Sequence, residues 1–291
     1  MSSQHTTPSD DNAPGFRAIR FNMDWITRPL FGIVLGIIAL GVVSSGPKVV
    51  AIFVAVGFTL AALEWHRCVG GGTVDRAETA LTALSIMLAE AVFLYTGLFW
   101  AGLLVVALAA IASFGLALTQ GEKHPFWQAV GVPYLTIPAL CLLALCSAHN
   151  GALIVSGMLI IVWFTDTGAL IFGNLIGGKR LAPKLSPAKT WAGTIGGSLL
   201  GALVFSFYAR VFPGAPALTA LVFGFIFSFV AHAGDLFESF VKRRFGVKNS
   251  GAVIPGHGGV LDRIDSTLAA APVMALLVLV LHFNPVFWVH A

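Results

Sequence analysis

Residues 233–266, AGDLFESFVKRRFGVKNSGAVIPGHGGVLDRIDS, concentrate charge in a chain that is otherwise strongly apolar. The stretch holds four of the 13 acidic residues and five of the 17 lysines and arginines, and long apolar segments flank it. Its acidic residues form two pairs, each with a spacing of three, and the sequence Pro-Gly-His-Gly-Gly lies between the pairs. So much charge between apolar segments requires an explanation beyond packing.

The acidic pairs have the spacing of metal ligands on helices. Residues three apart lie on one face of a helix, so Asp262 would face the same way as Asp265. The same holds for Asp235 and Glu238. Gathered carboxylates repel one another unless a cation lies between them, and Mg²⁺ takes oxygen ligands from carboxylates and phosphates together. The residues predicted to hold this metal are Asp235, Asp262 and Asp265.

The glycine-rich turn and the basic side chains suit a phosphate. Backbone N–H groups of a turn such as 255–259 can hold an anion, and the basic side chains can neutralise more of its charge. Metal, turn and cations together indicate phosphoryl or nucleotidyl transfer. The alternative is a solvated loop beside the membrane, whose basic residues only set the topology. These residues are Lys242, Arg243, Arg244, Lys248 and Arg263.

A second candidate region lies at 165–197. Asp166 falls inside an apolar segment, where an acid costs about 2.5–3.5 kcal/mol and is usually functional or paired with a basic side chain. Ser186 and Pro187 predict a helix start, with serine as the N-cap and proline in the first turn. Lys189 and Thr190 would then project from that turn, beside free N–H groups that suit a phosphate. The alternative is a topology-setting loop before a capped helix.

The composition predicts an all-α, polytopic integral membrane protein. The chain is 57% hydrophobic and 10% charged, with a mean hydropathy of +0.88, which is not typical of a soluble domain. A spanning helix needs roughly 20 apolar residues, and about nine segments qualify, although the first two are short enough to leave eight as the alternative. The segments are 29–45, 48–63, 79–96, 98–118, 129–148, 152–172, 191–212, 217–239 and 267–289.

The basic residues predict the orientation of these segments. With the N-terminus in the cytoplasm, 15 of the 17 lysines and arginines lie inside, and only Lys48 and Arg210 lie outside. The charged stretch and the 173–190 loop then share the cytoplasmic face. The expected organisation is a disordered cytoplasmic tail at 1–28, transmembrane helices at 29–150 and a transmembrane catalytic region at 151–291.

The charged stretch resembles the signature of the phosphatidate cytidylyltransferases, also called CDP-diacylglycerol synthases. Their pattern is S-x-x-K-R, K-D, P-G-H-G-G and D-R-x-D, and one position departs, because Asn249 stands where the family has aspartate. The second region resembles the family's D-[ST]-G-A and S-P-x-K-T segments, although Ala192 replaces a larger polar or acidic residue. The resemblance covers about 150–275, and the N-terminal half is expected to agree only in hydropathy and length.

This resemblance implies the conversion of CTP and phosphatidate to CDP-diacylglycerol and pyrophosphate, with Mg²⁺. It implies a multi-pass protein of the inner membrane whose site faces the cytoplasm. CTP and phosphatidate are the expected partners, with no nucleic acid and with a homodimer as one state of assembly. The implied catalytic residues are Asp235, Lys248, His257, Asp262 and Asp265. The implied substrate-binding residues are Asp166, Ser186, Lys189, Thr190, Ser239, Lys242, Arg243, Gly256, Gly258, Gly259 and Arg263.

Two other functions fit the same residues. One is a related nucleotidyl- or phosphotransferase that acts on another lipid phosphate, such as an isoprenoid phosphate. The other is a non-catalytic homologue or a transporter on the same scaffold, for which Asn249 and Ala192 leave room. A transporter more often places its charges at broken helices near the midplane, whereas these charges gather at one end of the predicted segments.

Overall fold

The structure is a computed structural model that describes residues 24–212, 216–247, 251 and 258–286, with side chains from residue 32 onward. Within these ranges the chain is almost entirely helical, as predicted. The α-helices are α1 (Asp24–Ser44), α2 (Pro47–Val69), α3 (Arg76–Thr96), α4 (Phe99–Thr119), α5 (Pro125–Ser147), α6 (Gly151–Leu175), α7 (Trp191–Arg210), α8 (Ala217–Arg244) and α9 (Leu261–Ala275), and α9 continues as the π-helix η1 (Leu276–Val280).

The helices are long and apolar enough to confirm a polytopic membrane protein. Eight of them qualify as spans among the residues that the structure describes, namely α2 to α8 and the combined α9–η1. In α1 the described apolar part, Gly32–Ser44, is shorter, so a ninth span and the side of the N-terminus stay predictions. The described chain divides into two units between Ile37 and Ile38, and the unit that begins at Ile38 contains every site discussed below.

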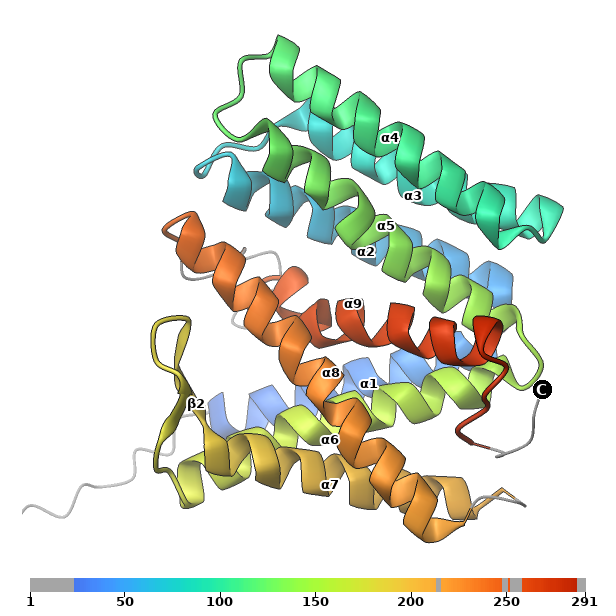
Figure 1. The fold of residues 1–291 in the computed structure, drawn as a ribbon, viewed down its shortest axis with the longest axis vertical. Coiled ribbons are helices and arrows are strands. Elements are labelled where there is room, and N and C mark those ends of the chain that lie inside the picture. Colours follow the sequence, from blue (N-terminus) through green and yellow to red (C-terminus); the bar gives the residue numbers. More distant parts are fainter. Residues whose placement is uncertain (1–23, 213–215, 248–250, 252–257, 287–291) are drawn as a thin grey trace, which may run out of the picture. The chain divides into compact units, whose positions relative to one another are not determined.

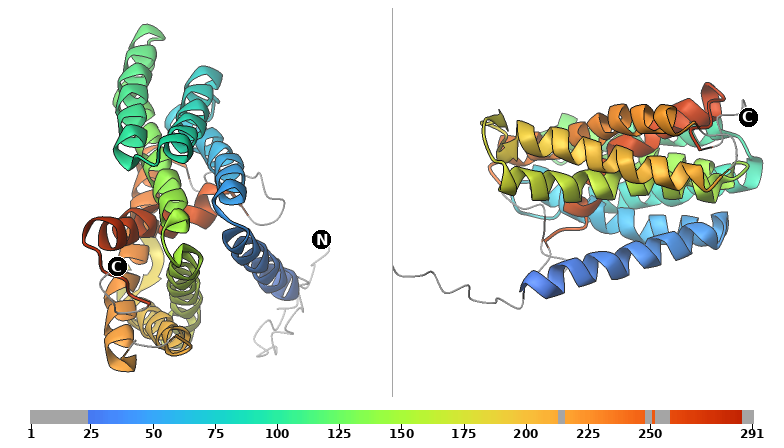
Figure 2. Two further views of the ribbon diagram at one scale, coloured as in Figure 1. Left: turned by 90° about the vertical axis from the view of Figure 1, so that its right-hand side faces the viewer. Right: turned by 90° about the horizontal axis from the view of Figure 1, so that it is seen from below.

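Small residues bring α6 and α7 into close contact, and the two helices run side by side (Figures 1 and 2). A side chain at Gly197 would collide with the backbone of Thr165 and Ala169, and one at Gly201 would collide with the Thr165 hydroxyl. Such contacts are the usual way in which small residues at a spacing of four pack membrane helices. Gly197 and Gly201 therefore lie on the face of α7 that packs against α6.

Buried polar contacts fix α2 against α3 and α5. The ring of His66 on α2 is fully buried, with Nδ1 2.6 Å from Gln128 Oε1 on α5 and Nε2 2.9 Å from Thr82 Oγ1 on α3. Trp65, also fully buried, donates from its indole to the Trp127 carbonyl at 3.1 Å. Buried polar groups with partners of this kind hold a helix in one register.

A short hairpin replaces the helix start that was predicted at Ser186. Strand β1 (Arg180–Ala182) pairs antiparallel with β2 (Ser186–Thr190), in the register Arg180↔Thr190 and Ala182↔Ser186. Helix α7 begins only at Trp191, and its N-cap is Thr190, whose Oγ1 accepts from Gly193 N at 3.0 Å. The prediction of Ser186 as N-cap is wrong, because strand pairing holds 186–190 extended and a threonine further along satisfies the free N–H groups.

Several loops and helix ends meet at one end of the second unit. Arg243 on α8 donates from Nε to the Leu185 carbonyl of the hairpin at 3.2 Å. Arg244 lies 5.5 Å from the Trp127 ring centroid, and Phe245 lies 5.2 Å from the His124 ring, so the start of α5 joins them. In Figure 1 the hairpin and the C-terminal end of α8 lie on the left. This shared end, called the charged end below, contains the candidate site.

Candidate active site

Three carboxylates from three helices lie close together at the charged end. Asp166 on α6, Asp235 on α8 and Asp265 on α9 interact electrostatically with one another. Helix α9 can approach α8 because Gly234 has no side chain, and any side chain there would collide with the backbone of Asp265 and Ser266. Asp265 is buried and the other two are partly buried. These three residues are called the carboxylate cluster below.

Lysine 189 supplies positive charge to the carboxylate cluster. Its ammonium forms an ion pair with Asp235 Oδ2, and it also interacts electrostatically with Asp166 and Asp265. Strand β2 positions this lysine, because Thr190 directly after it caps α7 and holds the end of the hairpin. The Ser239 hydroxyl lies 3.5 Å from Asp235 Oδ1, at the limit of a hydrogen bond. The predicted residues Asp166, Lys189, Asp235 and Asp265 are thus brought together.

A second ion pair beside the cluster joins α8 to α9. Lys242 Nζ lies 2.8 Å from Glu238 Oε2 and 2.8 Å from Asp262 Oδ1. The other carboxylate oxygen of Asp262 accepts from Gly259 N at 3.1 Å. Both oxygens of Asp262 therefore have protein partners, whereas Asp265 belongs to the carboxylate cluster. Asp262 and Asp265 are both on α9 but make different contacts.

One buried polar atom beside the cluster, the Tyr134 hydroxyl, lacks a hydrogen-bond partner within the described chain. The Tyr134 ring packs on Phe237 at 5.2 Å, and its phenol interacts electrostatically with Glu238 and Asp265. Leaving such an atom unpaired costs about 1–3 kcal/mol, so a polar ligand that accepts from the Tyr134 hydroxyl would remove this cost.

The carboxylate cluster fits Mg²⁺ by the chemistry of its donors. This ion prefers hard oxygen ligands, usually from one or two carboxylates, with water or substrate phosphate in the remaining positions. Among the residues that the structure describes, no three acidic, histidine or cysteine side chains converge in a ready metal-binding geometry. Lys189 neutralises Asp235 in the present arrangement, and Lys242 neutralises Asp262.

The other predicted site residues lie outside the carboxylate cluster or outside the described ranges. Gly258 and Gly259 lie just before α9, where Gly259 N donates to Asp262, and Arg263 is exposed in the first turn of the helix. Arg243 holds the hairpin carbonyl of Leu185, and Ser186 is the first residue of β2. The residues that fall outside the described ranges are Lys248, Asn249, Pro255, Gly256 and His257.

Three residues of the site were given no role by sequence reasoning. Glu238 was noted as the partner of Asp235 in an acidic pair but was given no ligand role, Tyr134 lies unmarked in an apolar run, and Glu64 was not considered. Glu64 ends up buried against the start of α9, 197 residues along the chain from its partner Leu261. The sequence could have pointed to Glu64 in one way, because an acid at the end of an apolar segment needs a partner.

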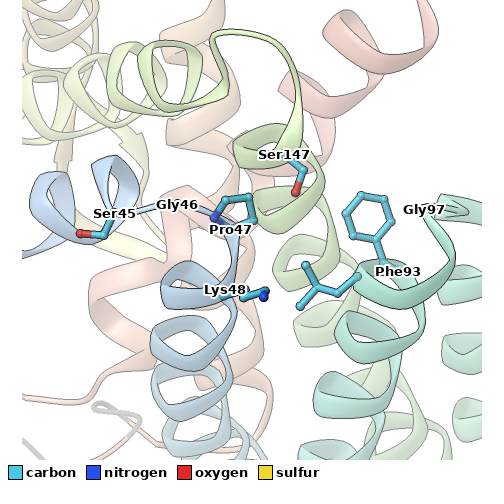
Figure 3. A pocket seen from close by; sticks show the side chains of 8 residues that line it. Ser45, Gly46, Pro47, Lys48, Phe93, Gly97 and Ser147 are labelled. Atoms are coloured by element: carbon cyan, nitrogen blue, oxygen red, sulfur yellow. The ribbon is translucent and has the colours of Figure 1, made fainter.

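A separate hollow of about 480 Å³ lies at the opposite helix ends (Figure 3). Its wall comes from the turn before α2, the end of α3 and the end of α5, and Lys48 is its charged residue. Figure 3 shows Lys48, Phe93 and Ser147 around it. Because α2 and α5 have their other ends at the charged end, this hollow is not part of the carboxylate cluster.

A helical membrane protein that brings carboxylates and lysines together at one end has the parts of an enzyme that transfers a phosphate-containing group. The chain belongs to the Cytidylyltransferase family, whose sequence profile matches residues 26–281. This match extends far beyond 150–275, so the expectation that the N-terminal half agrees only in hydropathy and length is wrong.

Relatives from several bacteria cover most of the chain. A protein of Brucella suis biovar 1 named phosphatidate cytidylyltransferase is 36% identical over 263 residues, which are 86% of this chain and 92% of that protein. One with the same name from Pseudomonas aeruginosa is 36% identical over 246 residues, covering 78% and 86%. Another from Rickettsia typhi is 33% identical over 190 residues, covering 63% and 82%.

Proposed function

We propose that this protein is a phosphatidate cytidylyltransferase, which makes CDP-diacylglycerol from CTP and phosphatidate. A phosphate oxygen of phosphatidate attacks the α-phosphorus of CTP and forms a new P–O–P bond. The bond between the α- and β-phosphates breaks, and pyrophosphate leaves. The observation that carries this proposal is the carboxylate cluster with its ion-paired Lys189, in a chain whose relatives have that name.

The main catalytic need of this reaction is neutralisation of charge, because both reactants are anions. Lys189 and Lys242 are the described cations nearest the cluster and would bind phosphate oxygens. No general base is required, because the attacking phosphate oxygen is already a nucleophile. Tyr134 has a buried hydroxyl group that can donate to a bound phosphate.

Asp235 and Asp265 would hold Mg²⁺, with Asp166 adding negative charge beside them. When bound, this ion supplies positive charge to the phosphates of CTP and the leaving pyrophosphate. Asp262 stays a predicted ligand, but it would first have to release Lys242.

The active site is proposed to face the cytoplasm from the inner membrane. The unequal distribution of basic residues supports this orientation, as does the contact between the 180–190 hairpin and the end of α8 at one end of the helices. CTP would then reach the site from the cytoplasm, while phosphatidate presents its phosphate at the headgroup level. A homodimer and the absence of a nucleic-acid partner stay predictions.

An assay of purified protein tests the function and separates it from the alternatives. Labelled CTP and Mg²⁺ are incubated with phosphatidate in one set of micelles and with an isoprenoid phosphate in another. Formation of labelled CDP-diacylglycerol only with phosphatidate is the expected result. Product from the isoprenoid phosphate alone would assign a different lipid substrate, and no product from either would favour a non-catalytic homologue.

A further inference from the structure

We propose that Glu64 of α2 is a positioning residue of the active site, which fixes the start of α9 and thereby Asp262 and Asp265. Its carboxylate is buried, with 2% of the residue exposed. Oε1 accepts from Val260 N at 3.1 Å, and Oε2 accepts from Leu261 N at 2.7 Å. This role deepens the proposed function, since it concerns the geometry of the same site.

The contact supplies a helix cap from a distant part of the chain. The first N–H groups of a helix have no partner within it, and the N-cap residue of α9, Val260, has no side chain that can accept from them. A carboxylate in this place satisfies two of these groups and also complements the positive end of the helix dipole. Such charge-assisted bonds are roughly twice as strong as neutral ones.

The same carboxylate also contacts Gly251. A side chain at this position would collide with the carboxylate of Glu64. Glu64 could avoid the collision only by giving up its bonds to Val260 and Leu261, because it is buried and held by both. Glycine at 251 therefore matters for space rather than for backbone conformation, and substitution there should act through Glu64.

The first turn of α9 is thus held from two sides. Glu64 holds its backbone from α2, and Lys242 holds the side chain of Asp262 from α8. Helix α2 is itself fixed by His66 and Trp65, which follow Glu64 within one turn. Because Asp265 lies one turn beyond Asp262, a shift in the helix start would move it relative to the rest of the carboxylate cluster.

The first test compares Glu64→Gln with Glu78→Gln. Glu78 is an equally buried acid that accepts from Ser113 at 2.5 Å on α4, away from α9. Glu64→Gln keeps the shape but loses the charge and turns an NH₂ group toward the α9 amides. We expect kcat to fall about tenfold or more with KM for CTP changed less than about threefold, while Glu78→Gln keeps kcat within about threefold.

A second readout does not depend on activity. Hydrogen–deuterium exchange of the peptide that contains Val260 and Leu261 should be about tenfold faster in Glu64→Gln and unchanged in Glu78→Gln. If the wild type lacks cytidylyltransferase activity, the proposed function fails and the exchange result alone decides whether Glu64 holds α9. Unchanged exchange in Glu64→Gln would overturn the positioning role, as would an unchanged kcat in an active enzyme.

A double-mutant cycle with Gly251 separates positioning from a general loss of folding. Gly251→Ala alone should speed exchange at Val260 and Leu261, because it pushes the carboxylate away. In the background of Glu64→Ala, where the collision is gone, Gly251→Ala should have no further effect. Additive effects of the two substitutions on exchange would contradict the proposal. If Glu64→Gln cannot be purified, Gly251→Ala alone serves as the test.

Discussion

Lys242 of α8 donates to Asp262 of α9 at 2.8 Å, and this contact joins the two helices that carry the acidic pairs of the signature. The same ammonium binds Glu238, whose side chain is only 2% exposed. A lysine that the sequence suggested for phosphate binding therefore also holds the protein scaffold of the site. Its two carboxylate partners would repel each other without it.

Replacing Lys242 should reduce stability as well as activity. Lys242→Met keeps the length of the side chain but leaves two carboxylates facing each other in largely buried surroundings. Removal of one partner from such a pair costs about 3–5 kcal/mol, so we expect a loss of about 3 kcal/mol in the free energy of unfolding. Denaturant unfolding in detergent measures it. Lys123 is exposed, so Lys123→Met is the control and should change stability by less than about 0.5 kcal/mol. Equal losses of stability in the two variants would contradict a stabilising ion pair at Lys242.

Asp265→Asn tests the carboxylate cluster. The substitution keeps the size of the side chain but removes its charge beside Asp166 and Asp235. We expect turnover to fall more than about 100-fold at any Mg²⁺ concentration, since even the outer-shell partners of metal ligands are worth about 10–100-fold and a direct ligand should be worth more. The variant should still insert and purify like the wild type. Activity near that of the wild type at saturating Mg²⁺ would show that Asp265 holds no metal.

Lys189→Gln tests the cation of the cluster. Lys189 is 19% exposed at its side chain and is paired with Asp235, whereas Lys184 lies exposed at the tip of the same hairpin. If Lys189 neutralises phosphate, Lys189→Gln should lower kcat/KM for CTP about 100-fold or more, because it removes a charge-assisted contact to an anion. Lys184→Gln should change it less than about threefold. Similar losses in both variants would indicate only a general electrostatic effect.

The orientation can be measured by labelling introduced cysteines. The three native cysteines, Cys68, Cys141 and Cys146, are buried, so they give a low background. A membrane-impermeant maleimide added to intact cells should label His149→Cys in the loop between α5 and α6 but not Lys184→Cys in the hairpin. After the cells are opened, Lys184→Cys should also react. Labelling of Lys184→Cys in intact cells would reverse the proposed orientation.

The sequence predicted those parts of the site that depend on short-range pattern. Asp262 opens α9, and Asp235 and Glu238 lie on α8, because helix periodicity and apolar length are local properties. The start of α7 was misjudged, because Ser-Pro is a common signal for a helix start, whereas here residues 186–190 pair with 180–182 in a hairpin. The contact of Glu64 with α9 could not be predicted, since it joins residues almost 200 positions apart through the packing of α2 on α9.

Asn249 is the one position at which the signature of this chain departs from that of the family, and it lies outside the described residues. Asparagine keeps the size of aspartate and one carbonyl acceptor but loses the charge. If the acid of the family binds metal directly, its loss should weaken Mg²⁺ binding about 10–100-fold. If that acid only orients the preceding lysine, here Lys248, the amide can partly replace it.

We expect the second case and a working enzyme, because Asp166, Asp235 and Asp265 already gather negative charge at the site. Asn249→Asp should therefore change kcat/KM by less than about tenfold, measured with labelled CTP and phosphatidate across a Mg²⁺ titration. The matched control, Asn150→Asp in the loop before α6, should leave both activity and Mg²⁺ dependence unchanged. A wild type that is inactive but rescued by Asn249→Asp would show that the natural protein is a disabled homologue, and the proposed function would then be wrong.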